Sequence, residues 1–445
     1  MKTSNKSSAN SPRKLLFSIY DQLKGGKIKQ HLEDLEKLSK ITDERIINER
    51  NLQLFKDLMD SVTQHVPAYR QYSSSTNLSE ISVLHKDKLK ADYKSYFSNK
   101  YSKSQLVEAK TSGSYGTPFS FYMTKDRKAR QQAEIIHFGK LSGYHVGQKH
   151  AYVRSTVKSP LKLWLQNELL ISPGIVNEEW LNEMRSKLME SKCEIIIGYP
   201  TVISNIATYC LSVGDKPSDF DVKGVITTSE PLHEKARKII HNCFGVEVLS
   251  RYSSEELGVI GQEKGIPGLH IINHFTHIVE VLKLNSDQPC DEGELGRVVV
   301  TDLFNDAFPL IRYDTGDLAE YVPAEKNKFG LPALKNLQGR TIEVIYTTEG
   351  EKITPMAING IFRDGDDSDK IVQYQFIQDE KVVYRLLLQL LEGEKVDEEL
   401  LIANLKKMLG QNAQISIEFV DHIPPLKSGK RPYIVNQYNR TGSSH

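Results

Sequence analysis

Hydrophobic residues near the start of the chain recur at the spacing of an α-helix. Leu32, Leu35 and Leu38 follow one another at intervals of three residues, with charged residues between them. Side chains spaced in this way lie on one face of a helix. Residues 15–72 are therefore predicted to form helices whose apolar faces pack into a core. Residues 1–14 are rich in Ser, Lys and Asn and are predicted to be a flexible tail.

In the middle of the chain, short apolar runs alternate with amphipathic stretches. The pattern predicts strands at residues 119–123, 194–200, 222–228 and 246–249, and helices at residues 125–141 and 234–243. Strands that alternate with helices are typical of an α/β domain in which most strands are parallel. Two later strand-like segments, 296–301 and 319–322, are expected to form a smaller β subdomain.

A change of pattern after residue 337 indicates a second domain. The Gln338-Gly339-Arg340 segment is a candidate hinge. Beyond it, the pattern predicts strands at residues 342–347, 382–391 and 413–420 and a helix at residues 397–409. We therefore expect a large N-terminal domain over residues 15–339 and a small, mobile α+β lid domain over residues 340–445.

Composition and charge exclude several classes of protein. The 445 residues carry a net charge of +1, which argues against nucleic acid as the main partner. No run of about 18 apolar residues predicts a membrane span, and the Ser/Lys-rich start does not have the pattern of a signal peptide. The four cysteines are far apart and form no CxxC pair, so a disulfide framework or a cysteine-rich zinc site is not expected. A cytoplasmic protein is the simplest expectation.

One loop combines glycines with hydroxyl groups. It is made up of Thr111, Ser112, Gly113, Ser114, Tyr115, Gly116 and Thr117, followed by Pro118. Glycines allow backbone N–H groups to approach a phosphate, and Ser and Thr hydroxyls add further donors. Because no Gly-Lys-Ser/Thr ends the loop, it is not a Walker loop. An ordinary Ser/Gly loop is an equally good explanation.

Carboxylates follow predicted strands at two places. Tyr252 and Glu256 come shortly after an apolar run, and an aromatic ring can stack on a purine while a carboxylate holds Mg²⁺. Asp314 and Asp317 lie on either side of Gly316, where carboxylates suit a ribose diol. Taken alone, each segment is more simply explained as a solvated acidic turn or an Asp/Gly turn.

Two basic positions lie beyond these carboxylates. Arg340 follows a glycine at the candidate hinge, and Lys430 follows Gly429 near the end of the chain. A lysine on a glycine turn can bring one mobile positive charge to a developing negative centre. A basic surface loop is the simpler explanation for this segment alone.

The order of these motifs resembles the adenylate-forming superfamily of acyl-CoA synthetases, peptide-synthetase adenylation domains and luciferases. The likeness runs over residues 108–435, and within the superfamily the chain looks like the phenylacetate-CoA ligase family, nearest to its CapK-like branch. Further residues that carry the resemblance are Gly198-Tyr199-Pro200, Ser229-Glu230-Pro231, Glu351 to Pro355 and Ile423 to Lys430.

The resemblance implies a role for each motif. The 111–117 loop would hold the β- and γ-phosphates of ATP. Ser229, Glu230 and Pro231 would line the adenine pocket, and Tyr252 would stack there. Glu256 would hold Mg²⁺. Asp317 would bind the ribose hydroxyls with help from Arg340, and Lys430 would bridge the substrate carboxylate and the α-phosphate.

The implied activity is formation of an acyl-adenylate from ATP and a small carboxylic acid, with release of pyrophosphate. The small domain would then rotate, and the acyl group would pass to coenzyme A or a carrier-protein thiol. The CapK-like branch is linked to capsule or surface-polysaccharide genes. An enzyme that transfers AMP to a non-carboxylate acceptor, and a nucleotide-binding protein without catalysis, remain open as alternatives. The acid itself is expected near residues 137–144, 198–203 and 227–228.

Some positions depart from the family pattern. Thr117 and Phe119 stand where many members have a lysine in or after the phosphate loop, and Ile342 stands at the usual acidic hinge position. Lys264 and Gln338 fall where some relatives have zinc-binding cysteines, so no zinc is expected.

Overall fold

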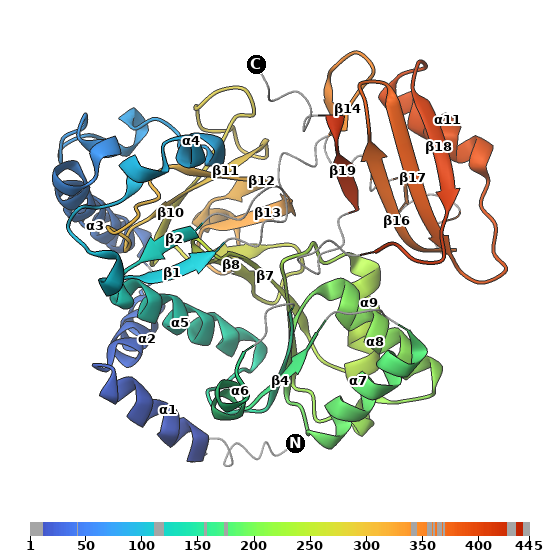
Figure 1. The fold of residues 1–445 in the computed structure, drawn as a ribbon, viewed down its shortest axis with the longest axis horizontal. Coiled ribbons are helices and arrows are strands. Elements are labelled where there is room, and N and C mark those ends of the chain that lie inside the picture. The colour runs from blue at the N-terminus through green and yellow to red at the C-terminus, as the bar shows by residue number, and fades with distance from the viewer. Residues whose placement is uncertain are drawn as a thin grey trace. The chain divides into compact units, whose positions relative to one another are not determined.

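The computed structural model describes residues 12–438 apart from residue 42 and residues 111–119, 155–157, 173–176, 340–344, 354–357, 359–360, 363–366, 368–369 and 425–432. The chain divides into two compact units (Figure 1). The first contains residues 1–315 and 319–337, and the second contains residues 338–445 together with the short segment 316–318.

The first unit begins with three helices, α1 (Pro12–Leu23), α2 (Lys27–Leu38) and α3 (Glu44–His65), as the hydrophobic spacing predicts. Leu35 of α2 is buried in one cluster with Ala133 of α5 (Lys125–Gly139). Helix α1 starts at Pro12, inside the segment predicted to be a tail. The fixed φ of proline suits the first turn of a helix, and this explains the earlier start.

A large sheet forms the centre of the first unit, with the strand order β10-β11-β12-β13-β9-β8-β7-β6-β5-β3-β4. Its parallel half contains β3 (His150–Val153), β4 (Glu168–Ile171), β5 (Ile195–Gly198), β6 (Gly224–Thr228) and β7 (Val248–Ser254). Its other half contains β8 (Gly258–Glu263), β9 (His270–Ile272), β10 (His277–Leu282), β11 (Leu295–Asp302), β12 (Tyr313–Val322) and β13 (Ala333–Gln338). The predicted α/β class is confirmed. The strands expected as a β subdomain continue the same sheet, because β8 turns back beside β7 in antiparallel pairing.

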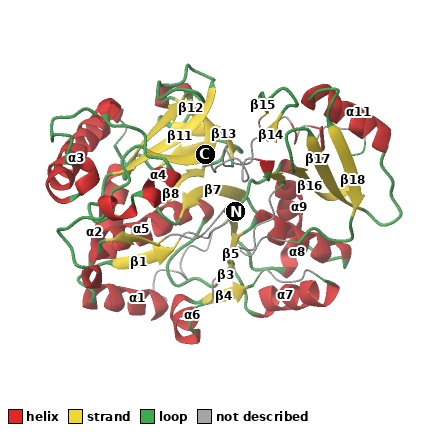
Figure 2. Cartoon of the chain, turned by 45° about the horizontal axis from the view of Figure 1, so that its top comes forward, coloured by secondary structure: helices red, strands yellow, loops and turns green. Residues whose placement is uncertain are grey.

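Helices cover both faces of the parallel half (Figure 2). On one face, α7 (Glu178–Glu190), α8 (Pro200–Ser212) and α9 (Glu234–Phe244) pack on Ile196, Val225 and Val248. On the other face, Ile197 and Ile226 pack against Tyr144, which follows α5. The remaining elements of this unit are α4 (Lys86–Ala91), α6 (Pro160–Gln166) and the antiparallel pair β1 (Val107–Lys110) and β2 (Ser120–Met123).

The second unit has its own sheet and core. Strands β16 (Ile371–Gln378), β17 (Val383–Leu390), β18 (Gln414–Phe419) and β19 (Ile434–Asn436) form a four-stranded sheet in the order β18-β17-β16-β19. Helix α11 (Glu398–Leu409) buries Leu401, Leu405 and Leu409 in the same cluster as Phe376 of β16. A short pair, β14 (Ile345–Tyr346) and β15 (Lys352–Ile353), completes the α+β arrangement. The mobility of this unit stays a prediction.

Candidate active site

Three of the predicted motifs meet at one edge of the large sheet. Strands β5, β6 and β7 are parallel neighbours, and Gly198 lies beside Thr227 while Thr228 lies beside Arg251. The 198–200 turn follows β5, the 229–231 turn follows β6, and Glu256 follows β7. In open α/β sheets, ligands bind beyond the carboxyl ends of such strands. The fold therefore brings these separate motifs together at an edge suited to a ligand.

Glu230 joins two of these turns. Its carboxylate accepts hydrogen bonds from the hydroxyl and the backbone N–H of Thr201, at 2.7 Å and 3.3 Å, in the first turn of α8. Ser229 precedes it in a left-handed conformation with φ of 72°, which turns the chain sharply after β6. Glu230 is buried, whereas Ser229 and Pro231 are exposed. The role of Ser229, Glu230 and Pro231 in an adenine pocket stays a prediction. The structure shows in addition that Glu230 links this turn to α8 through Thr201.

Tyr252 connects β7 to β12. Its hydroxyl lies 3.1 Å from the Thr315 hydroxyl, which donates to the Val298 carbonyl at 2.9 Å. The Tyr252 ring is buried in the core cluster of the antiparallel half of the sheet. The register of β7 against β8 shifts after Tyr252, and such a bulge changes the direction of the side chains that follow. Stacking of this ring on adenine remains a prediction.

Asp314 and Asp317 have different surroundings. The segment predicted as an Asp/Gly turn is part of the continuous strand β12, in which Gly316 has a left-handed φ of 76°. Asp314 is buried and pairs with Arg297 at 2.7 Å, so its charge is already balanced. Asp317 is half-buried on the same strand. Of the two carboxylates, Asp317 is the better candidate for a ribose diol.

Glu256 is a buried carboxylate in the turn between β7 and β8. The residue is 5% exposed, and no hydrogen bond or ion pair of its side chain occurs within the part of the chain that the structure describes. Its oxygens are not among the fully buried polar atoms without a partner in the described residues, so the carboxylate can reach solvent or a ligand. Carboxylate oxygen is the ligand type that Mg²⁺ prefers, and Mg²⁺ commonly takes one or two carboxylates plus substrate phosphates. The residue therefore fits the predicted metal ligand.

Several hydrogen bonds fix the Glu256 turn. Arg127 of α5 donates to the Leu257 carbonyl at 2.6 Å, and His277 donates to the same oxygen at 3.0 Å. Gln131 donates to the carbonyl of Glu255 at 3.2 Å. Burial lowers the pKa of His277 to about 4, so its ring is neutral near pH 7. The turn is thus held from two sides, by α5 and by β10.

A buried ionic network contacts the Glu256 turn through Arg127. Arg127 pairs with Asp302 at 2.7 Å and with Glu134 at 3.0 Å, and all three side chains are at most 1% exposed. Burial would lower the pKa of Arg127, but the two carboxylates outweigh it and the pKa is raised. Burial also raises the pKa of Glu134, against the influence of Arg127. The sequence pattern does not single out these residues, because charges on a helix usually indicate a solvated face.

Arg251 is a further buried cation on β7. Its guanidinium donates to Gln262 at 2.7 Å, and one terminal nitrogen has no hydrogen-bond partner among the residues described. Burial lowers its pKa to about 10. Thr228, from the predicted acid pocket, lies beside it on β6. The sequence offers no signal that this arginine is buried.

Some predicted site residues lie outside the described part of the chain. These are the phosphate loop Thr111 to Thr117, the hinge residue Arg340 and the catalytic candidate Lys430.

Within the described ranges, no group of three or more His, Cys, Asp or Glu side chains is placed to hold a metal ion. The four cysteines are free thiols. No helix among the described residues is long and apolar enough to cross a membrane.

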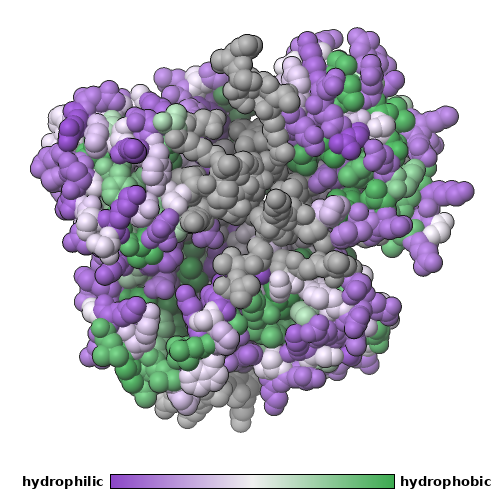
Figure 3. Space-filling model, in the orientation of Figure 1, coloured by the Kyte–Doolittle hydropathy of each residue, from purple (hydrophilic) through white to green (hydrophobic). Residues whose placement is uncertain are grey.

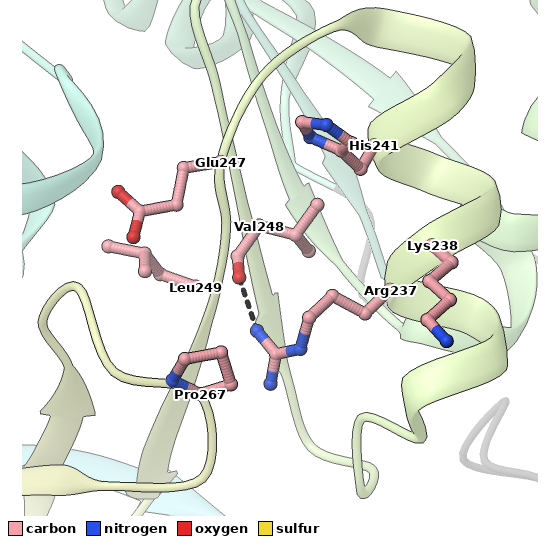
Figure 4. Close-up of a pocket in the computed structure, with 7 residues that line it drawn as sticks. All are labelled: Arg237, Lys238, His241, Glu247, Val248, Leu249 and Pro267. Atoms are coloured by element: carbon pink, nitrogen blue, oxygen red, sulfur yellow. Dashed lines mark hydrogen bonds between the residues drawn. The ribbon is translucent and has the colours of Figure 1, made fainter.

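A hollow of about 290 Å³ lies elsewhere, between α9 and the start of β7 (Figure 4). Arg237 extends across it, donating to the Val248 carbonyl at 2.5 Å and pairing with Glu263 at 2.8 Å. It is also lined by Lys238, His241, Glu247, Leu249 and Pro267. Because it lies at the amino end of β7, it is not part of the site at the carboxyl ends.

Comparison with known proteins identifies relatives with this architecture. Residues 345–437 match the CapK C-terminal domain family. Protein CapK of Staphylococcus aureus is 24% identical over 434 residues, covering 92% of each chain. The phenylacetate-coenzyme A ligase of Thermus thermophilus is 29% identical over 136 residues, covering 29% of this chain and 30% of its own.

Among solved structures, a 2-hydroxyisobutyryl-CoA ligase in the postadenylation state, in complex with R3-HIB-AMP, has a TM-score of 0.68. It is 16% identical to this chain, and the match covers 88% of this chain and 90% of the other. The chain is similar to CapK over most of its length and has the fold of this solved ligase. ATP-bound MatB from Rhodopseudomonas palustris has a TM-score of 0.54 and 15% identity, over 75% of this chain and 68% of its own. The predicted resemblance to the superfamily, the phenylacetate-CoA ligase family and CapK is confirmed.

Proposed function

We propose that this protein is an ATP-dependent carboxylate–AMP ligase, which forms an acyl-adenylate and releases pyrophosphate. The observation that carries the proposal is the meeting of three motif turns at the carboxyl ends of β5, β6 and β7, with the buried carboxylate of Glu256 among them. The homology to CoA ligases supports the ligase class. The solved relatives are described with ATP, with an acyl-adenylate and with coenzyme A, which supports ATP as the co-substrate.

In the proposed reaction, an oxygen of the substrate carboxylate attacks the α-phosphate of ATP. The bond from that phosphorus to the bridging oxygen breaks, and pyrophosphate leaves. When bound, Mg²⁺ offsets negative charge on the phosphate oxygens. Glu256 would hold the ion, Asp317 would orient the ribose, and Lys430 would bring a positive charge to the α-phosphate and the attacking carboxylate. No side chain of the protein needs to act as a nucleophile.

The later steps belong to the same proposal. The acyl group would pass to coenzyme A or a carrier-protein thiol, after rotation of the small domain about the 338–340 segment. We also propose a cytoplasmic role in surface-polysaccharide biosynthesis, and the likeness to CapK is the support for it.

The direct test is pyrophosphate release from ATP and Mg²⁺ with hydroxylamine as the acyl trap. The acids supplied would be aryl acids, short and long fatty acids, amino acids and hydroxy acids. Release and hydroxamate formation with one class of acid would establish the ligase and its substrate class together. ATP binding without release for any acid would favour the alternative enzyme, which transfers AMP to a non-carboxylate acceptor.

Replacing Asp317 by alanine should weaken ATP binding about 10- to 100-fold, because hydrogen bonds to a charged group typically contribute about 1.5–3 kcal/mol. Calorimetric titration with ATP and Mg²⁺ would measure the change. The matched control is Glu320→Ala on the same strand, whose carboxylate bonds Lys335 and Asn336 and should be dispensable for ATP. Equal ATP affinity in Asp317→Ala and the unmodified protein would rule out the ribose assignment.

A further inference from the structure

Helices α1 and α6 expose an unusual number of large hydrophobic side chains, which together we call the α1–α6 patch. Eight of the seventeen exposed large hydrophobic residues among those described lie on these two helices. They are Leu15, Leu16, Ile19, Tyr20 and Leu23 of α1 and Leu161, Trp164 and Leu165 of α6. In Figure 3 a hydrophobic surface gathers at the lower left, where Figure 1 places these helices. Contiguous apolar surface of this kind marks an interaction site.

The exposure follows from how α1 is anchored. Leu15, Ile19 and Leu23 are spaced four residues apart and form one stripe, of which Leu15 is 64% and Leu23 is 84% exposed. On the opposite side, Phe17 packs against the core formed with α2 and α5. Asp21 is buried and accepts hydrogen bonds from the first turn of α2. The helix is therefore fixed with its apolar stripe facing outward.

Arg13 joins the two helices into one surface. Its guanidinium donates to the carbonyl of Trp164 and lies 5.1 Å from the centre of the indole ring. Trp164 remains 57% exposed, and Leu161 beside it is 67% exposed. The stripe of α1 and the exposed side of α6 thus present a single apolar face.

The exposed charged residues in α1 and α6, and at residue 24 directly after α1, are all positive. Lys14, Lys24 and Lys162 are exposed in or beside the two helices. The only acidic residue in α1 and α6 is Asp21, which is buried. Leucine and aromatic residues flanked by lysines are the composition of helices that lie in a membrane interface. Acidic lipid headgroups attract such lysines.

We propose that the α1–α6 patch docks this protein on an anionic membrane surface. The apolar side chains enter the headgroup region while the lysines face acidic lipids. With twelve residues, α1 is about 18 Å long, so it lies on the bilayer and does not span it. A second copy is the less favourable occupant, because a two-fold interface would bring the same lysines of both copies together. This inference does not depend on the proposed adenylation.

The full chain would be tested by flotation with two kinds of vesicle, one of phosphatidylcholine alone and one of phosphatidylcholine with phosphatidylglycerol in equal parts. We expect binding to the anionic vesicles, weaker binding as salt is raised, and little binding to phosphatidylcholine. The double variant Leu15→Gln/Leu23→Gln should bind the anionic vesicles at least ten-fold less. Glutamine keeps high helix propensity, so α1 should remain helical.

Two control variants separate the patch from general surface effects. Leu211→Gln/Leu400→Gln changes two exposed leucines outside the patch and should bind like the unmodified protein. Lys14→Gln/Lys24→Gln should reduce both the binding and its salt dependence, whereas Lys37→Gln/Lys56→Gln should change neither. Melting temperatures of all variants would verify that each is folded.

Absence of vesicle binding by the unmodified protein would overturn the proposal. Equal binding of the Leu15→Gln/Leu23→Gln variant would overturn it as well, because the contact would then lie elsewhere. Light scattering would measure the oligomeric state of the unmodified protein and of this variant. A dimer that becomes a monomer only in this variant would assign the patch to a second copy.

Discussion

Replacing Lys430 by alanine should lower the rate of acyl-adenylate formation about 100- to 1000-fold. A single preorganised charge or donor at a developing negative centre typically contributes about 2.7–4 kcal/mol to the transition state. The substrate carboxylate and the α-phosphate are both negative, and the proposed lysine reduces their repulsion as the new bond forms. Because that interaction develops in the transition state, ATP binding should be largely retained.

Single-turnover pyrophosphate release would measure the rate, and a shift of the melting temperature with ATP and Mg²⁺ would verify binding. Lys427 provides a matched control, since it is a lysine in the same basic segment, three residues earlier. The Lys427→Ala variant should retain most of the rate. Full activity of Lys430→Ala would exclude the proposed mechanism, and equal losses in both variants would point to a general charge effect.

Replacing Arg127 by methionine should lower the free energy of unfolding by about 3–5 kcal/mol, the usual cost of removing one partner from a buried ion pair. Methionine fills much of the same volume but leaves Asp302 and Glu134 buried without their shared cation. It also removes the hydrogen bond to the Leu257 carbonyl. That bond fixes the turn of Glu256, so the Mg²⁺ concentration needed for half-maximal activity should rise too.

Urea unfolding followed by circular dichroism would measure the stability. In the control variant Arg45→Met, an exposed arginine paired with Asp43 is replaced, and the free energy of unfolding should hardly change. The triple variant Arg127→Met/Glu134→Gln/Asp302→Asn should recover part of the loss, because the uncompensated charges are removed with the arginine. If Arg127→Met lowers the free energy of unfolding by less than about 1 kcal/mol, the buried ion pairs of Arg127 contribute little net stability.

The sequence predicted the elements whose hydrophobic period is regular. The helix expected at 125–141 is observed as α5 from Lys125 to Gly139, and the strand expected at 222–228 is β6 from Gly224 to Thr228. It also predicted three turns that the parallel strands bring to one edge. These features depend on local periodicity and on the rule that parallel strands end at the same edge.

Features that depend on distant partners were not predictable in this way. Arg127 and Glu134 on α5 read as part of a solvated helix face, because the burying partner Asp302 lies 175 residues after Arg127. Asp314 looked equivalent to Asp317 until the structure placed it against Arg297. The site residues of the phosphate loop, the hinge and Lys430 stay predictions.

The contact of Glu230 with Thr201 has a consequence for phosphate binding. The start of an α-helix carries a partial positive charge and exposed N–H groups, which in many nucleotide-binding proteins attract phosphate. In this protein a carboxylate from the neighbouring turn already occupies the start of α8. The negative charge of Glu230 makes that helix end less favourable for a phosphate. We therefore expect the hydrogen-bond donors to the phosphates of ATP to come mainly from the hydroxyls and backbone amides of the 111–117 loop.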